Sequence, residues 1–361
     1  GKHSLPGATE NPARLKARAA NKGVSPGAGG FGPLCRRRAA AEGNDMLDVA
    51  VIGCGIVGAN VAYLLSQHKL RAAVFEKEND VSMGTTRANS AIVHAGYDPE
   101  PGTAMARLNV RGSALTKEQC AAFDVKYRQI GSLVLAFSDE EMATVRRLYE
   151  NGVANGVPGV RVLTREETLA MEPNLSDAVC GALYAPSAAI VEPWDLALAL
   201  AEAAVENGVE LHLETAVTGA EKISGGWRLH TAKGDFEARA VVNAAGVEAD
   251  LVAAMAGEPG FTTIPSRGEY YLLDKSQGYV VNHVVFQCPN RDGKGVLVSP
   301  TVHYNLIVGP NAEPSGREDV STQADALAFV REKAVKGVPG VNFRENIRIF
   351  AGERANTDQS D

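Results

Sequence analysis

A short apolar segment followed by three closely spaced glycines constrains the fold of this chain more than any other feature. Residues 47–52 (LDVAVI) lead directly into residues 53–58 (GCGIVG). An apolar run that ends at a glycine turn predicts a buried parallel strand, and residues 56–68 keep the apolar spacing of a helix. Residues 72–75 predict a second strand, which ends at Glu76. This strand–turn–helix–strand unit predicts a dinucleotide-binding site.

Each position of the unit has a mechanical reason. Gly53 permits the tight turn, Gly55 lets the backbone approach a pyrophosphate, and Gly58 lets helix and strand pack closely. The helix N-terminus offers unpaired N–H groups to phosphates, and the carboxylate of Glu76 can accept hydrogen bonds from ribose hydroxyls. The alternative is a glycine-rich turn that binds nothing, and the combination of strand, helix and acidic residue argues against it.

Composition narrows the class of protein. The chain has 361 residues, enough for two domains or one large one, and 45% of them are hydrophobic. Its formal charge of −7 argues against general nucleic-acid binding. No apolar run has the length of a transmembrane helix. The five cysteines are scattered without a Cys-x-x-Cys pair, which favours a reducing compartment and gives neither a disulfide framework nor a metal site.

The first 45 residues differ from the rest of the chain. They hold 8 Lys/Arg and 3 Asp/Glu and are rich in Gly, Ala and Pro without hydrophobic periodicity. Such a segment is expected to be disordered. An Arg-rich, acid-poor segment also suits an organelle transit peptide. Because Met46 stands directly before the first strand, we favour translated upstream sequence or a non-native extension for residues 1–45.

The remaining pattern predicts an α/β protein. Buried strands and helices of the nucleotide-binding type recur at 46–125, 190–260 and 345–361. The segments between them, 126–189 and 261–344, read as short strands alternating with turns and a few helices. We therefore expect a Rossmann-like domain, of the glutathione-reductase-like kind, with a discontinuous, mostly antiparallel α+β substrate domain inserted into it.

Four passages together resemble the FAD-dependent oxidoreductases of the D-amino-acid oxidase superfamily. They are residues 51–58 (VIGCGIVG), 84–97 (GTTRANSAIVHAGY), 242–246 (VNAAG) and 350–354 (FAGER). Within that superfamily, the chain is most similar to bacterial glycerol-3-phosphate dehydrogenases and oxidases and to L-2-hydroxyglutarate oxidases. The likeness extends over about residues 46–361.

The resemblance implies FAD as cofactor and a set of residues that hold it. The polar loop 84–90 would follow the ribityl chain and pyrophosphate, residues 243–246 would bring the backbone close to the dinucleotide, and Val217 would contact adenine through its backbone. A solvated turn and an ordinary packed strand end are the alternatives for the two segments. The expected cofactor-binding residues are Gly53, Gly55, Ile56, Val57, Gly58, Glu76, Lys77, Thr85, Thr86, Asn89, Ser90, Val217, Ala245 and Gly246.

The resemblance also implies catalytic candidates. His94 would lie beside the flavin ring and act as a base, although a lone histidine in an apolar stretch is more often a core residue. Arg354, two residues after Gly352, would bind the carboxylate or phosphate of the substrate through its planar guanidinium. Weaker candidates are Arg267 for the same role, Tyr270 or Tyr271 as a pocket wall, and His303 facing the substrate.

The expected activity is oxidation of a small anionic alcohol, first sn-glycerol 3-phosphate, with hydride transfer to flavin N5. The electron acceptor is open between oxygen, a quinone and a redox protein. We expect a cytoplasmic protein and leave peripheral association with the inner face of the membrane open. The alternatives are a 2-hydroxy acid oxidase, an amine or amino-acid oxidase, and a non-catalytic FAD-binding module.

Two departures from the family pattern bear on these expectations. L-2-hydroxyglutarate oxidases carry a His-x-Thr element where this chain has residues 297–299 (LVS), which favours glycerol 3-phosphate. The family also continues beyond the Gly-x-Arg element with another glycine-rich loop. We therefore expect the chain to be C-terminally truncated, with weak retention of FAD.

Overall fold

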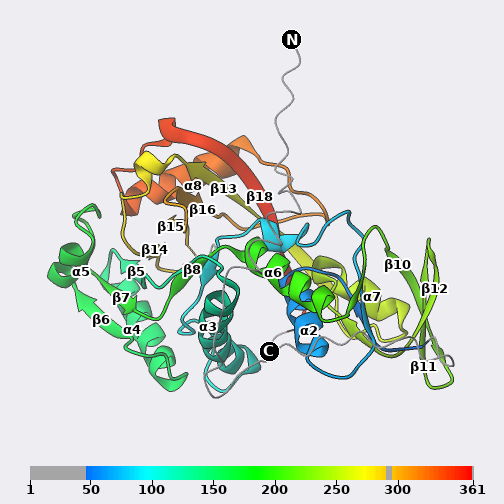
Figure 1. Cartoon of the computed structure of the whole chain (residues 1–361). Coiled ribbons are helices and arrows are strands. Elements are labelled where there is room, and N and C mark those ends of the chain that lie inside the picture. The colour runs from blue at the N-terminus through cyan, green and yellow to red at the C-terminus, as the bar shows by residue number, and fades with distance from the viewer. Residues whose placement is uncertain (1–45, 290–294, 360–361) are drawn as a thin grey trace, which may run out of the picture. The chain divides into compact units, whose positions relative to one another are not determined.

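The computed structural model describes residues 46–289 and 295–359, and the expectation for residues 1–45 concerns a segment outside this range. Within the described part, the strands form three sheets (Figure 1). No helix there combines the length and the apolar character that crossing a bilayer requires.

The first sheet has six strands in the order β10-β11-β12-β1-β2-β9. Strands β12, β1, β2 and β9 are parallel, and β10–β12 form an antiparallel meander at one edge. Buried Val51 and Val74 face one side, where α2 and α6 pack together (Figure 1). The members are β1 (Leu47–Ile52), β2 (Ala72–Phe75), β9 (Glu210–His212), β10 (Val217–Ile223), β11 (Gly226–Thr231), β12 (Gly234–Asn243), α2 (Ile56–Ser66), α3 (Ala104–Phe123), α6 (Pro193–Glu206) and α7 (Ala249–Met255).

The second sheet is larger and mostly antiparallel. Its order is β17-β13-β16-β15-β14-β5-β7-β6, with β18 paired to β13, and the β14–β5 pair is parallel. Leu133 and Leu135 face a core with α8, whereas Val134 and Ala136 face one with α4. The members are β5 (Ser132–Ala136), β6 (Arg161–Thr164), β7 (Gly181–Ala185), β13 (Thr263–Leu273), β14 (Val284–Gln287), β15 (Leu297–Pro300), β16 (Leu306–Gly309), β17 (Glu313–Pro314), β18 (Asn346–Thr357), α4 (Asp139–Ala154), α5 (Arg165–Met171) and α8 (Ala324–Gly337).

The third sheet is small and has three short strands. Strand β8 (Ala189–Val191) pairs with β3 (Ile92–Val93) on one side and with β4 (Tyr127–Arg128) on the other. In the part of the chain that the structure describes, four short 3₁₀ turns complete the connections: η1 (Thr85–Arg87), η2 (Gly246–Glu248), η3 (Lys275–Gln277) and η4 (Phe343–Glu345).

The predicted α/β class and the pairing of a parallel nucleotide-type sheet with a mostly antiparallel one are confirmed. One detail differs from the expectation. By its pairing with β13, β18 belongs to the second sheet and not to the nucleotide sheet, where residues 345–361 were expected. The reason is that almost the whole length of β18 finds hydrogen-bond partners on β13. With β18 moved to the second sheet, we still propose that residues 126–189 and 261–344 form the substrate domain.

Close packing of α2 on β1 makes Gly58 a stability determinant. A Cβ at Gly58 would lie 1.9 Å from the carbonyl oxygen of Gly53, a backbone atom that cannot move away. We expect Gly58→Ala to lower the free energy of unfolding by about 2–3 kcal/mol or more, measured by urea titration without added flavin.

Gly112 in α3 is the matched control, because a Cβ there would meet no atom within 4 Å. Gly112→Ala should raise the free energy of unfolding by about 0.5–1 kcal/mol, since alanine favours helix interiors. Equal effects at the two positions would contradict the packing argument.

Candidate functional site

The turn after β1 has the geometry of a dinucleotide-binding turn. Gly53 adopts φ +95°, and its N–H donates to the carbonyl of Phe75 at 2.8 Å. A Cβ at Gly53 would lie 2.5 Å from the carbonyl oxygen of Ala244. Burial, with Glu76 and Asp80 nearby, raises the pKa of the Cys54 thiol to about 12, so this thiol stays protonated and structural.

Glu76 is held at the end of β2 with its carboxylate directed at that turn. Its Oε2 accepts from the N–H of Cys54 at 2.7 Å, and its Oε1 accepts from the N–H of Glu78 at 3.0 Å. The side chain is 8% exposed. A carboxylate has about four acceptor positions, so these two bonds leave capacity for the hydroxyls of a ribose.

The N-terminus of α2 faces the polar loop that was expected to follow the cofactor. Gly55 is the N-cap and supplies no capping side chain; instead, the N–H of Ile56 donates to Oγ1 of Thr86 at 3.0 Å. Val57, the next residue, is 62% exposed. A glycine cap, a hydroxyl and an exposed apolar side chain therefore meet where a pyrophosphate would approach the helix.

The rest of that loop is held by its own side chains and by β18. The side-chain amide of Asn89 donates to the carbonyls of Thr85 and Thr86 at 3.0 and 2.8 Å. Oγ1 of Thr85 donates to the carbonyl of Glu353 at 2.8 Å. A Cβ at Gly352 would lie 1.9 Å from the carbonyl oxygen of Ala88, so this contact requires a glycine.

The remaining expected cofactor residues lie around the same turn. Ala245 precedes η2, and Gly246 adopts φ +59°. Val217 begins β10, two residues after Thr215, whose N–H donates to the carbonyl of Glu76 at 2.8 Å. Lys77 directly follows Glu76, and its ammonium pairs with Glu248 at 2.9 Å and Glu318 at 2.6 Å.

These residues fit a dinucleotide. A side chain at Gly53 or Gly58 would collide with backbone atoms, and the buried Glu76 carboxylate lies at the end of the neighbouring strand. The residues that would hold the dinucleotide are therefore the glycines of the turn, the first residues of α2, Glu76 and the 84–90 loop.

A cavity of about 150 Å³ brings together three of the catalytic candidates. His94, Tyr270 and Arg354 line it, together with Thr85, Ala88, Asn89, Ser90, Ala91, Ile92, Gly352 and Glu353. The hydroxyl of Tyr270 lies 3.2 Å from Oγ of Ser90. Burial raises the pKa of Tyr270, against the opposing effects of Ser90 and Arg354, so the phenol keeps its proton.

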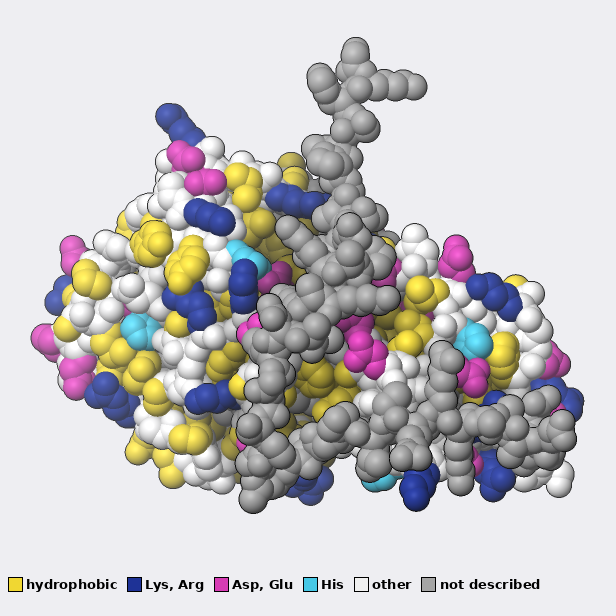
Figure 2. All heavy atoms as spheres, in the orientation of Figure 1, with side chains coloured by type: hydrophobic (Ala, Val, Ile, Leu, Met, Phe, Trp, Pro, Cys, Tyr) yellow, Lys and Arg dark blue, Asp and Glu magenta, His cyan; other side chains and the backbone are white. Residues whose placement is uncertain are grey.

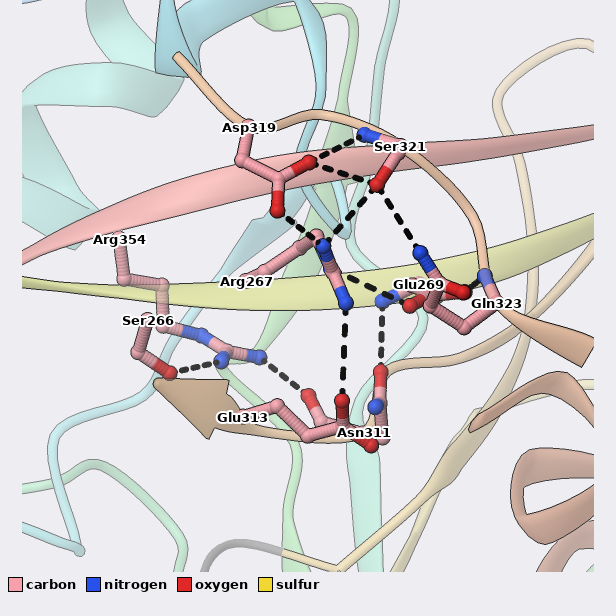
Figure 3. A network of polar contacts seen from close by, with 9 residues as sticks. All are labelled: Ser266, Arg267, Glu269, Asn311, Glu313, Asp319, Ser321, Gln323 and Arg354. Atoms are coloured by element: carbon pink, nitrogen blue, oxygen red, sulfur yellow. Dashed lines mark hydrogen bonds and ion pairs between the residues drawn. The ribbon is translucent and has the colours of Figure 1, made fainter. Parts of the chain in front are cut away.

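The two candidate arginines have different surroundings (Figure 3). The guanidinium of Arg354 donates to Oγ of Ser266 at 3.4 Å and to the carbonyl of Asn311 at 3.3 Å. Across the described residues, no carboxylate lies within ion-pair distance of it. Its donors are therefore oriented by neutral groups, and its charge is not compensated.

Arg267 is neutralised inside the protein. Its side chain is 7% exposed and pairs with Asp319 at 2.5 Å, Glu269 at 3.2 Å and Glu313 at 3.6 Å. Three carboxylates around one guanidinium leave no net positive charge for a substrate anion. Arg267 is also absent from the residues that line the cavity, and we leave it out of the proposed substrate site.

His303 does not line the cavity that contains His94. It lines a second cavity with Lys126 and Arg128, and its imidazole bonds to Lys126 and Glu192. The expectation that His303 faces the same substrate as His94 is therefore not carried further. Tyr271 points to Phe343, because neighbouring residues of a strand face opposite sides.

Several residues of the site were missed from the sequence. The ring of Phe350 stacks on Tyr270 with centroids 4.8 Å apart, and Phe286 stacks on His94 at 5.8 Å. Ser266 and Asn311 hold Arg354. Phe350 could have been found, since the period of two in a strand places residues 350, 352 and 354 on one face. Asn311 and Phe286 are distant in sequence and carry no such signal.

The family model described as FAD dependent oxidoreductase matches residues 48–361. The chain belongs to this family. FAD is accordingly the cofactor. We propose that the glycine turn, Glu76 and the 84–90 loop hold it.

Individual relatives agree with the family. Glycerol 3-phosphate dehydrogenase of Caloramator mitchellensis is 47% identical over 88% of this chain, which spans 66% of that relative, just under two thirds. L-2-hydroxyglutarate dehydrogenase of Escherichia coli is 30% identical over 86% of this chain and 75% of its own length. Among solved structures, L-alpha-glycerophosphate oxidase from Mycoplasma pneumoniae with FAD bound superimposes with a TM-score of 0.83 at 29% identity, covering 88% of this chain and 85% of that one.

The segment after β17 is tied to the cofactor side by an ion pair that should make stability pH-dependent. Arg317 donates to both carboxylate oxygens of Asp250, at 2.7 and 2.6 Å, and this holds the pKa of Asp250 well below its usual range. A carboxyl whose pKa is lower in the folded chain than in the unfolded chain stabilises the fold. This contribution is complete at pH values above the unfolded pKa of about 3.9, and it is lost as the pH falls from there through the folded pKa. We expect Arg317→Gln to cost about 2 kcal/mol at pH 7 and less at pH 3, measured by urea titration.

Arg165→Gln is the control for this prediction. Its nearest carboxylate oxygen, on the fully exposed Asp177, is 3.9 Å away. Surface pairs of this kind contribute about 0–1 kcal/mol, so the control should change little at either pH. A penalty for Arg317→Gln that stays constant between pH 7 and pH 3 would contradict the assignment.

Proposed function

We propose that this chain carries the catalytic part of a flavoenzyme that oxidises the CH–OH group of a small anionic alcohol, with sn-glycerol 3-phosphate as the first candidate. The observation that carries the proposal is the uncompensated guanidinium of Arg354 in the cavity that His94 and Tyr270 also line. The 47% identity to a glycerol 3-phosphate dehydrogenase supports the choice of substrate.

Each side chain has a distinct part in this proposal. Arg354 holds the phosphate of the substrate through paired N–H donors that Ser266 and Asn311 orient. His94, with its ring positioned against Phe286, takes the proton of the reacting hydroxyl. The protonated Tyr270 hydroxyl closes the buried side of the cavity and can donate to a substrate oxygen. FAD, when bound, supplies the acceptor for the hydride that leaves the carbinol carbon.

L-2-hydroxyglutarate is the second candidate, because a carboxylate can replace a phosphate on the same arginine. The 30% identity to an L-2-hydroxyglutarate dehydrogenase supports it. Ser299 occupies a position where the pattern of those enzymes expects a His-x-Thr element. It is fully buried, and its hydroxyl donates to the carbonyl of Pro300 at 2.9 Å. We therefore rank this substrate second.

The substrate assignment is tested by anaerobic absorption spectroscopy of the chain reconstituted with FAD. Adding sn-glycerol 3-phosphate should bleach the flavin band. Arg354→Gln should raise the substrate concentration needed for half-maximal reduction by about 30-fold or more, equivalent to losing about 2 kcal/mol of charge-assisted binding.

The matched control is Arg348→Gln, an exposed position on the same strand, which should leave that concentration unchanged. Bleaching by L-2-hydroxyglutarate alone would reverse the order of the two substrates. Bleaching by glycine or sarcosine alone would point to an amine oxidase. Bound flavin that none of these compounds reduces would favour a non-catalytic FAD-binding module.

The role of His94 is tested by stopped-flow reduction of the flavin. If His94 accepts the hydroxyl proton, His94→Ala should lower the limiting reduction rate by about 10²–10⁴-fold, as losses of general bases do. His230→Ala removes a histidine that pairs with Asp235 at 2.9 Å on the distant β11 and should leave the rate within about twofold of wild type. Rapid reduction in the His94 variant would remove the base assignment.

A further inference from the structure

A second cavity lies away from the proposed substrate site. Its volume is about 460 Å³, and it forms where β4 meets η3 and the turn after β15. The two cavities share no residue. It is lined by Lys126, Tyr127, Arg128, Lys275, Val302, His303 and Tyr304. Figure 2 shows basic side chains among hydrophobic ones on the upper left of this view, over that part of the fold.

Three cations line the cavity, and none of them forms an ion pair with a carboxylate of the described residues. Over residues 46–289 and 295–359, no carboxylate lies within ion-pair distance of Lys126, Arg128 or Lys275. The neighbouring Asp274 directs its Oδ1 to the N–H of Ser276 at 2.9 Å, where it caps η3, and its charge partly offsets that of Lys275. Lys126 and Arg128 have no such neighbour in the lining, so the cavity wall is basic although the whole chain carries a formal charge of −7.

His303 separates this basic cavity from a buried acid, Glu192. The ammonium of Lys126 can only donate, so Nδ1 of His303 accepts from it at 3.0 Å. Nε2 of the same ring then carries the proton and donates to the carboxylate of Glu192, which is 9% exposed. The imidazole therefore satisfies Glu192 and places a polar, uncharged edge at the cavity wall.

The wall of the cavity is held in a fixed geometry. Tyr304 adopts φ +69°, a conformation that costs a bulky residue free energy unless its surroundings fix it. Its N–H donates to the carbonyl of Thr301 at 3.0 Å, and a Cβ at Gly278 would lie 1.7 Å from its carbonyl oxygen. The guanidinium of Arg128 stacks over the Tyr304 ring, 4.6 Å from its centroid, and also donates to the Thr301 carbonyl.

We propose that this cavity binds a small ligand bearing phosphate groups. Arg128 presents a guanidinium oriented by an aromatic ring, and Lys126 and Lys275 add point charges, which together match the charge and the several acceptor oxygens of a phosphate. The concave shape favours a compact ligand over a flat surface. The proposal goes beyond the oxidation reaction and does not depend on it.

The test measures binding of inorganic pyrophosphate by isothermal titration calorimetry to the full chain saturated with FAD, so that the nucleotide site is filled. The double variant Arg128→Gln/Lys275→Gln removes two of the three charges and leaves the Lys126–His303 contact in place. We expect its dissociation constant for pyrophosphate to rise about tenfold or more.

The control variant is Lys222→Gln/Arg239→Gln on β10 and β12, which makes the same change of net charge. Lys222 lies over the ring of Trp227, and Arg239 is 60% exposed, so the control also removes one stacked and one exposed cation. The control should bind pyrophosphate within about twofold of wild type. Equal weakening in both double variants would overturn the proposal, because it would show a response to net charge alone.

A parallel arm distinguishes a free ligand from a lipid head group. Co-sedimentation with phosphatidylglycerol vesicles, against pure phosphatidylcholine vesicles, uses the same two double variants. Binding to vesicles but not to pyrophosphate, lost in Arg128→Gln/Lys275→Gln, would support the phosphate chemistry and assign it to a membrane surface. Binding of neither probe by the wild-type chain would overturn the proposal.

Discussion

The approach of β18 to the loop before β3 determines where the candidate site can form. Gly352 lies so close to Ala88 that any Cβ would overlap its carbonyl oxygen. Because β18 pairs with β13 over most of its length, this contact and the hydrogen bond from Thr85 to the carbonyl of Glu353 hold the second sheet against the loop expected to follow the cofactor. The strand's alternation then places Phe350 and Arg354 on the face of Gly352. Tyr270, directly opposite Phe350 in the register, reaches the same cavity.

The site depends equally on which charges the fold compensates. Arg267 and Arg354 lie on the paired strands, yet the first is surrounded by three carboxylates and the second by a hydroxyl and a carbonyl. A buried guanidinium without its carboxylates would be costly, so the acids around Arg267 serve the fold. Arg354 is only half-buried, and neutral acceptors orient it without cancelling its charge. The same residue type thus has a structural role at one position and is available for a ligand at the other.

The sequence predicts the parts of this molecule in which local pattern and function coincide. The turn at Gly53, the helix behind it and the acidic end of β2 could all be placed, because each follows from steric and hydrogen-bonding rules acting over a few residues. Arg267 could not be separated from Arg354 in this way, since Asp319 lies 52 residues from Arg267 and pairs with it only after folding. Asn311 and Phe286 were missed for the same reason. The pairing of β18 also depends on a partner strand that is distant in sequence.

Lys77 forms an ion pair with Glu318 of the segment 313–323, a contact that the sequence around Lys77 does not predict. As the neighbour of Glu76 it was expected to contact the cofactor. Although burial alone would lower the pKa of its ammonium, hydrogen bonds to Glu318 and Glu248 outweigh that effect and raise it. The same segment carries Arg317 to Asp250 on the cofactor side and Asp319 to Arg267 on the substrate side. Its ion pairs therefore join both sides of the site, and the charge of Lys77, next to Glu76, holds this segment in place.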